Sequence, residues 1–180
     1  LLNRTEPGGP FAFESIAVPD GVAFDDDRDA GGRPTYGVVI APLLPGESRP
    51  QILELNYGRR ANRLWIVDAA DDGSLRFEDA AARLGLDGDA VRHGRHPAWL
   101  AERAKTDARF ARDDEKPFRS HGNTFDAAIG DVDGDGRLDV ALAEIAHAWA
   151  GDSSDRSRVL LAGDDGRFAT RDGVSLDRMP

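Results

Sequence analysis

Short apolar or alternating runs, each bounded by glycine, proline or aspartate, recur along the chain. The clearest are YGVVIAPL from Tyr36, QILELNY from Gln51, FDAAIG from Phe125 and DVALAEI from Asp139. Their length and alternation are typical of β-strands rather than helices. The first two runs flank one loop and the last two flank another, so the pattern predicts two antiparallel strand pairs.

A second pattern joins an apolar pair, a glycine-containing turn and a phenylalanine. It occurs in LLNRTEPGGPFAFES from Leu1, RLWIVDAADDGSLRFED from Arg63 and RVLLAGDDGRFATRD from Arg158. Each copy predicts a β-hairpin, since Asp-Gly between strand formers is a strong hairpin signal. The phenylalanines Phe13, Phe77 and Phe168 are spaced by 77 − 13 = 64 and 168 − 77 = 91 positions, so the second interval carries an insertion.

Two further matches share one offset. FDDDR from Phe24 matches RDDEK from Arg112, and GESRPQIL from Gly46 matches GDGRLDVA from Gly134, with 112 − 24 = 88 and 134 − 46 = 88. A constant offset indicates an internal repeat. Each repeat reads as strand, loop, strand, turn, strand, turn, strand, and four antiparallel strands repeated radially predict a propeller blade.

The expected fold is therefore all-β, a partial β-propeller of about two to three four-stranded antiparallel blades with one helical insertion. The expected parts are the end of a blade at 1–23, a degenerate blade at 24–85, the insertion at 86–122 and a blade with an acidic loop at 123–180. Closed propellers have roughly four to eight blades. We therefore expect a segment of one propeller domain, which belongs to a larger chain or associates with itself.

Within the insertion, HPAWLAERAKTDARFARDD from His96 predicts a helix. Pro97 suits the first turn and no glycine follows until Gly122. A narrow apolar stripe is expected at Trp99, Leu100, Ala104 and Ala108, with Phe110 or Ala111. The simplest interpretation is a surface helix that covers part of the sheet.

The acidic stretch GDVDGDGRLDV runs from Gly130 to Val140. Its carboxylates occupy positions 1, 3, 5 and 9 of a loop: Asp131, Asp133, Asp135 and Asp139. Gly136 at position 6 permits a sharp bend, and the carbonyl of Arg137 at position 7 offers another oxygen. Calcium binds six to eight oxygens, and a cation offsets the repulsion between clustered carboxylates. The loop is a predicted Ca²⁺ site.

An EF-hand is the main alternative for this loop. It would require a glutamate at position 12, which here is Leu142, and two long flanking helices. The flanking sequences alternate as strands do. The loop is therefore expected to join two strands.

At these residues the chain resembles a known family. TFDAAIGDVDGDGRLDVALAE from Thr124 resembles the FG-GAP or VCBS repeat, the calcium-loop blade of integrin α-subunit propellers, and RVLLAGDDGRF matches the hairpin that follows. NYGRRANRLWIVDAADDGSLRFEDAAARLGL from Asn56 is similar to secreted propellers related to cartilage acidic protein and the UnbV group. The resemblance covers most of the chain except 86–122. It implies that the four aspartates are side-chain ligands and that Arg137 binds through its carbonyl.

The earlier loop departs from this pattern. At the offset of 88 the ligand positions become Leu43, Pro45, Glu47 and Gln51, and Ser48 replaces the glycine. Carboxylates are lost at positions 1, 3 and 9, so this loop is expected to bind no metal.

Net charge and composition narrow the function classes. The net charge is −10 and the pI about 4.8, which disfavours nucleic acid as a partner. Without cysteine there is neither a disulfide framework nor a thiolate metal site. No apolar run is long enough for a membrane span. The first residues lack signal-peptide features, and the start at Leu1 suggests a trimmed or excised segment.

Other chemistry-bearing residues have simpler interpretations. Asp25, Asp26, Asp27 and Asp29 lack the alternating spacing and read as a solvated loop. His93, His96, His121 and His147 read as surface histidines, and Arg92 and Arg95 disfavour a cation beside the first two. The loop HAWAGDSSDRSR from His147 combines Trp149 with Ser153 and Ser154. It either binds a sugar or peptide or is held by its own hydrogen bonds.

Two functions stay open. The first is a non-enzymatic recognition or adhesion module, extracellular or in the cell envelope, with structural calcium and a protein or carbohydrate ligand bound through loops. The second is a propeller-based polysaccharide lyase or hydrolase, for which His147, Asp155 and Arg156 are the first candidates. No catalytic arrangement is visible in the sequence, which favours the first.

Overall fold

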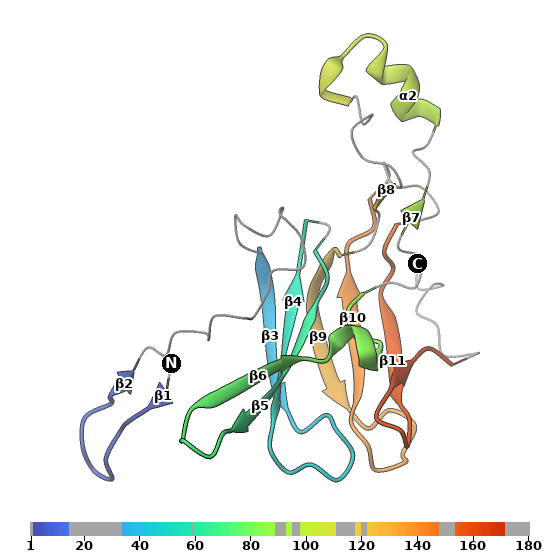
Figure 1. The fold of residues 1–180 in the computed structure, drawn as a ribbon. Coiled ribbons are helices and arrows are strands. Elements are labelled where there is room, and N and C mark those ends of the chain that lie inside the picture. Colours follow the sequence, from blue (N-terminus) through green and yellow to red (C-terminus); the bar gives the residue numbers. More distant parts are fainter. Residues whose placement is uncertain are drawn as a thin grey trace.

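The predicted strands form two four-stranded antiparallel sheets, which stand side by side in Figure 1. This computed structural model describes residues 2–14, 34–58, 60–88, 93–94, 98–110, 118–119, 122–147 and 154–171. The first sheet contains β3 (Thr35–Ala41), β4 (Gln51–Asn56), β5 (Arg63–Ala69) and β6 (Leu75–Asp79). The second contains β9 (Thr124–Gly130), β10 (Asp139–Glu144), β11 (Arg158–Ala162) and β12 (Phe168–Ala169).

In both sheets the spatial order of the strands follows the chain, and the registers correspond. Ile40 pairs with Ile52 in the first sheet as Ile129 pairs with Val140 in the second. The first strands are thus offset by 129 − 40 = 89 positions and the second strands by 140 − 52 = 88. The one-residue difference arises because the second loop is one residue shorter.

The last two strands of each sheet also correspond, although the hairpins differ in length. Val67 pairs with Phe77, and Ala162 pairs with Phe168. Phe77 and Phe168 occupy equivalent positions in the two sheets and are 91 residues apart, the spacing noted in the sequence. The hairpin of the first sheet is longer and extends beyond this pair to Leu75.

One core lies between the two sheets. The first sheet contributes Leu53, Leu55 and Leu64, and the second contributes Val140, Leu142, Leu160, Ala162 and Phe168. These residues alternate with outward-facing ones, as the period of a strand requires. The first strands β3 and β9 also contact one another. Gly37 suits this close approach, since a Cβ there would lie 3.3 Å from the carbonyl oxygen of Phe125 in β9.

A short helix closes one end of the core. The helix α1 (Ala81–Leu84) follows β6 and buries Ala81 and Leu84. It ends at Gly85, whose φ of 83° lies in the left-handed region. The sequence does not predict this helix, because four residues are too few to give a helical period.

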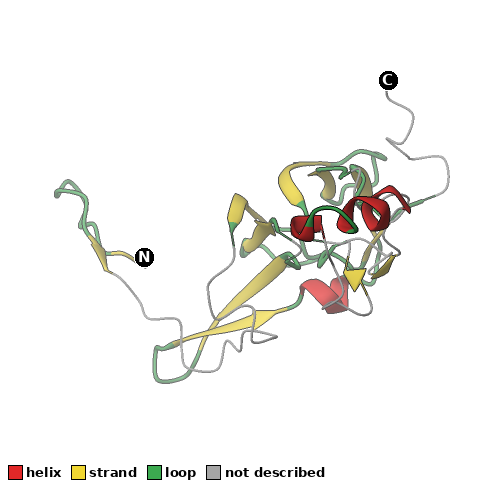
Figure 2. Cartoon of the chain, turned by 90° about the horizontal axis from the view of Figure 1, so that it is seen from above, coloured by secondary structure: helices red, strands yellow, loops and turns green. Residues whose placement is uncertain are grey.

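The first predicted hairpin forms a sheet of its own. Its strands β1 (Leu2–Asn3) and β2 (Phe13–Glu14) pair only with each other among the described strands. In the view from above they lie apart from the two main sheets (Figure 2). Phe11 and Phe13 are exposed there. That this hairpin ends a blade stays a prediction.

The predicted helix in the insertion is shorter than expected. The helix α2 covers Ala98–Ala104, and a separate 3₁₀ turn, η2, covers Ala108–Phe110. Asp107 breaks the helix because its carboxylate accepts bonds from the backbone N–H and the guanidinium of Arg109, as an N-terminal cap does. Within the predicted stripe, Leu100 is buried while Trp99 is exposed.

A two-stranded ladder at the base of the insertion was not anticipated. It consists of β7 (His93–Gly94) and β8 (Phe118–Arg119). In Figure 1 α2 lies beyond this ladder, away from the main sheets. No helix of the described part of the chain has the length and apolar character that crossing a membrane requires.

The mostly β fold with four-stranded antiparallel sheets is thus confirmed, and the described sheets do not close into a barrel. Their membership of a propeller stays a prediction.

Candidate metal centre

The acidic loop joins β9 to β10, as predicted, and therefore does not belong to an EF-hand. It lies at the same end of the molecule as the loop between β3 and β4 (Figure 1). Gly134 and Gly136 have φ values of 79° and 87°. Only glycine adopts these angles without strain, so the two residues let the loop wind tightly.

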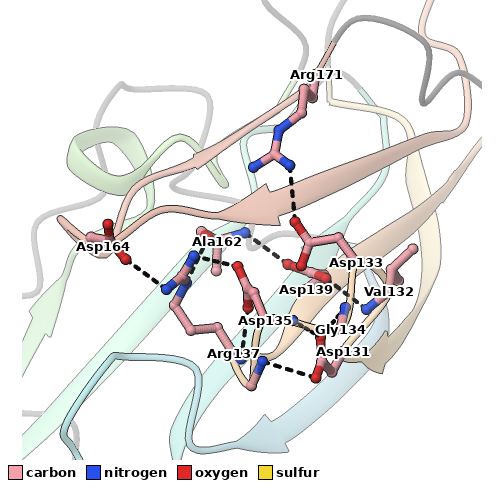
Figure 3. Close-up of polar contacts among 11 residues, drawn as sticks. Asp131, Val132, Asp133, Gly134, Asp135, Arg137, Asp139, Ala162, Asp164 and Arg171 are labelled. Atoms are coloured by element: carbon pink, nitrogen blue, oxygen red, sulfur yellow. Dashed lines mark hydrogen bonds and ion pairs between the residues drawn. The ribbon is translucent and has the colours of Figure 1, made fainter.

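Three of the four predicted carboxylates come together in this loop (Figure 3). Asp131, Asp133 and Asp139 each offer one oxygen, and these oxygens lie within 4.8 Å of one another. Calcium–oxygen distances are roughly 2.4 Å, so two oxygens on opposite sides of one ion lie about 4.8 Å apart. The three side chains therefore fit around a single calcium ion.

Asp131 organises the loop through the backbone. One of its carboxylate oxygens accepts hydrogen bonds from the N–H groups of Gly134 and Asp135, at 2.8 and 3.0 Å. The other accepts a bond from Gly136 N–H at 2.9 Å. The loop is wound around this carboxylate, and position 1 is thereby fixed within the cluster.

Asp139 links the loop to the sheet. It is fully buried, and its two oxygens accept bonds from the N–H groups of Val132 and Ala162, both at 2.8 Å. Val132 lies in the loop, whereas Ala162 ends β11. A buried carboxylate is stable only if it is well bonded. Asp139 therefore joins the loop to the third strand.

Two of the four carboxylates, one inside the cluster and one outside it, contact arginines. Asp135 accepts bonds from the backbone N–H and the guanidinium of Arg137, so it is turned away from the three-carboxylate cluster. Asp133 forms an ion pair with Arg171 at 3.0 Å. Both arginines supply positive charge to a loop that carries an excess of negative charge.

The contacts that hold Arg137 have no signal in the sequence. Its guanidinium donates to the carbonyl of Ala162 at 2.9 Å and to Asp164 at 2.6 Å. Asp164 belongs to the predicted hairpin turn, but nothing in the sequence relates that turn to the acidic loop. Arg171 follows β12, and nothing in the sequence indicates its contact with Asp133 either.

The loop between β3 and β4 repeats part of this arrangement with a neutral group. Gln51 is the equivalent of Asp139. Gln51 pairs with Ala41 at the end of β3, as Asp139 pairs with Gly130 at the end of β9. Its amide oxygen accepts bonds from the N–H groups of Leu43 and Leu44, at 2.7 and 3.2 Å. The offset of 89 in the first strands makes Leu43 the counterpart of Val132, because 132 − 43 = 89.

This register corrects the sequence alignment of the two loops. Position 1 corresponds to Pro42 rather than to Leu43, which still provides no oxygen side chain. Glu47, the acidic residue of this loop, forms an ion pair with Arg49 at 3.3 Å. The prediction that this loop binds no metal is unchanged.

The side chains suspected in an enzyme lie elsewhere. The Tyr57 hydroxyl is 3.2 Å from Nε2 of His147, and burial lowers the pKa of His147. Asp155 is fully buried and accepts a bond from Asn123 at 2.8 Å. Arg156 is exposed. Ser154 accepts a bond from His147 N–H at 2.6 Å, which joins the two described residues on either side of 148–153.

Several predicted features fall outside the described residues. They are Asp25 to Asp27, Asp29, His96, His121, Trp149 and Ser153. For His93 only the backbone is described.

No protein-family model, curated protein or solved structure matches this chain.

Proposed function

We propose that this chain is a calcium-binding propeller segment of the FG-GAP/VCBS type that acts as a non-enzymatic recognition or adhesion module outside the cytoplasm. The observation that carries the proposal is the carboxylate cluster of Asp131, Asp133 and Asp139 in a loop between neighbouring strands, with oxygens within 4.8 Å of one another. The resemblance of the loop sequence to this family supports the same assignment.

The role of calcium in this proposal is structural. Asp139 bonds both the loop and β11, so an ion bound there connects the loop to the sheet. The side chains of the cluster are all oxygen donors, which suit a hard cation such as calcium rather than zinc. In the proposed site the Asp135 carboxylate gives up its contact with the Arg137 guanidinium and coordinates the ion. The backbone carbonyl of Arg137 is a further ligand.

The propeller assignment draws on the arrangement of the sheets. Both have four antiparallel strands in chain order, their first strands β3 and β9 touch, and their first loops lie at the same end (Figure 1). Radial repetition of such sheets around their first strands gives a propeller.

Calcium titration tests the metal assignment. We expect one site with a dissociation constant of roughly 10⁻⁴ to 10⁻³ M, the range of extracellular calcium modules. Asp133→Ala removes one ligand and is expected to abolish the heat signal in calorimetry. The matched control is Glu47→Ala in the other loop, which should leave the affinity unchanged. Unaltered binding in Asp133→Ala, or binding lost in Glu47→Ala, would contradict the assignment.

Exposed aromatic rings at the end of the strands opposite the acidic loop support a recognition role. Tyr36 and Phe125 are about half exposed, and their ring centroids are 4.9 Å apart. Such rings stack well on sugar rings or on side chains of a partner. We expect retention of a ligand on a glycan array, reduced by Tyr36→Ala, without cleavage of that glycan. Release of shortened products would instead favour the lyase or hydrolase alternative.

A further inference from the structure

One face of the first sheet is apolar and largely uncovered. It carries Val38, Ile40, Ile52, Trp65 and Phe77, all on the side opposite the core; these residues are called the bulky face. Val38 is 58% and Ile40 is 65% exposed. Beside them Trp65, Phe77 and Ile52 line a shallow hollow of about 460 Å³.

The corresponding face of the second sheet is covered. By register Ile129, Val140 and Phe168 are the counterparts of Ile40, Ile52 and Phe77. Phe168 is only 4% exposed and Val140 is fully buried. What covers them is the other face of the first sheet, through Leu53, Leu55 and Leu64. The two sheets thus pack head to tail, with unlike faces in contact.

The second sheet leaves the complementary face open along β9 and β10, whereas Val159 and Leu161 of β11, which lie on the same face, are buried. At the places where the first sheet has Val39, Leu53 and Leu55, it has Ala128, Ala141 and Ala143; these three are called the alanine face. They line a hollow of about 620 Å³ whose rim includes Arg156. Small side chains on this face leave room for large ones on whatever packs against it.

We infer that the bulky face of one molecule packs into the alanine face of a second copy of this chain. The contact repeats the head-to-tail packing of the two sheets within the molecule, with Trp65 and Phe77 filling the alanine-lined hollow. Aromatic side chains inserted into a hollow are the usual anchors of such interfaces.

Charged groups of both signs lie at both faces. On the bulky face Glu54 is paired with Arg63 across the sheet, and its oxygens accept bonds from Trp65 Nε1 and Thr35 Oγ1, both at 3.0 Å. The hollow of the alanine face is lined by Asp126 and Glu144 as well as by Arg156, so the fit of large side chains against small ones, rather than charge, carries the pairing. A contact between unlike faces extends from copy to copy, so it builds a ring or an open chain rather than stopping at a dimer.

Two variants each block one face without touching the core. Ile40→Lys puts a charge on the bulky face, and Ala143→Arg fills the hollow. Light scattering after size exclusion should find wild-type oligomers larger than a dimer that grow with concentration. Each variant alone should weaken association about tenfold or more. An equimolar mixture of the two should form a 1:1 dimer, because each partner retains one intact face.

The control is Phe11→Ser, which removes an exposed apolar ring from the separate hairpin and should leave the oligomers unchanged. Circular dichroism verifies that all variants are folded. A monomeric wild type would overturn the inference, since something other than a second copy would then cover the face. A dimer formed by either variant alone would mean that like faces meet, and a mixture that stays monomeric would also contradict the pairing of unlike faces. The same results are expected in calcium and in EDTA, so the test is independent of the proposed metal site.

Discussion

Asp139→Ala is expected to destabilise the protein by about 2–4 kcal/mol even when calcium is absent. The substitution leaves the N–H groups of Val132 and Ala162 without the carboxylate that they share, and both bonds are 2.8 Å long. Each buried donor that loses its partner costs about 1–3 kcal/mol. Urea unfolding in EDTA measures the loss, and in the same variant calorimetry should detect no calcium binding.

Two other variants separate the structural role of Asp139 from its role as a ligand. Asp139→Asn keeps one acceptor oxygen, so it should cost about half as much stability while still weakening calcium binding. Gln51 indicates that a neutral amide suffices for the structural part, since it holds Leu43 and Leu44 at the equivalent place. Asp135→Ala should change the stability little, because the bonds that Asp135 accepts come from Arg137 in the same solvent-exposed loop. If Asp139→Ala unfolds in EDTA at the wild-type urea concentration, the carboxylate does not hold the loop.

The strands and hairpins could be predicted because their signals are local. In QILELN the apolar residues alternate with the polar ones, and Leu53 and Leu55 are indeed both fully buried. The Asp-Gly turns likewise encode their hairpins within a few residues. The spacing of the acidic loop was enough to bring together Asp131, Asp133 and Asp139, because a tight loop turns alternate side chains to one side.

The parts that could not be predicted depend on neighbours distant in sequence. Trp65 and Leu160 hold equivalent register positions, yet Leu160 is 2% exposed while Trp65 is half-buried. Nothing in the two strand sequences tells which face a second sheet covers. Asp135 follows the loop pattern but bonds Arg137, whose position depends on Ala162 and Asp164 in the next hairpin.

Gly85→Ala is expected to have an effect comparable to that of Asp139→Ala, at about 3–5 kcal/mol. Gly85 has a φ of 83°, and a Cβ built there would lie 2.4 Å from the carbonyl oxygen of Phe168. The left-handed conformation alone costs an alanine about 1–2 kcal/mol. The clash adds to this cost because a backbone carbonyl cannot rotate away. Either α1 or β12 must move, and both border the core.

Gly73→Ala is the matched control, and it isolates the contact from the backbone conformation. Gly73 has a φ of 80°, but nothing lies within 4 Å of the position of its Cβ. This variant should therefore cost only the conformational part, about 1–2 kcal/mol. Urea unfolding of both variants gives the difference, which measures how firmly the helix after the first sheet is seated against the last strand of the second. Equal losses in the two variants would mean that α1 and β12 separate at little cost and that the core does not depend on their contact.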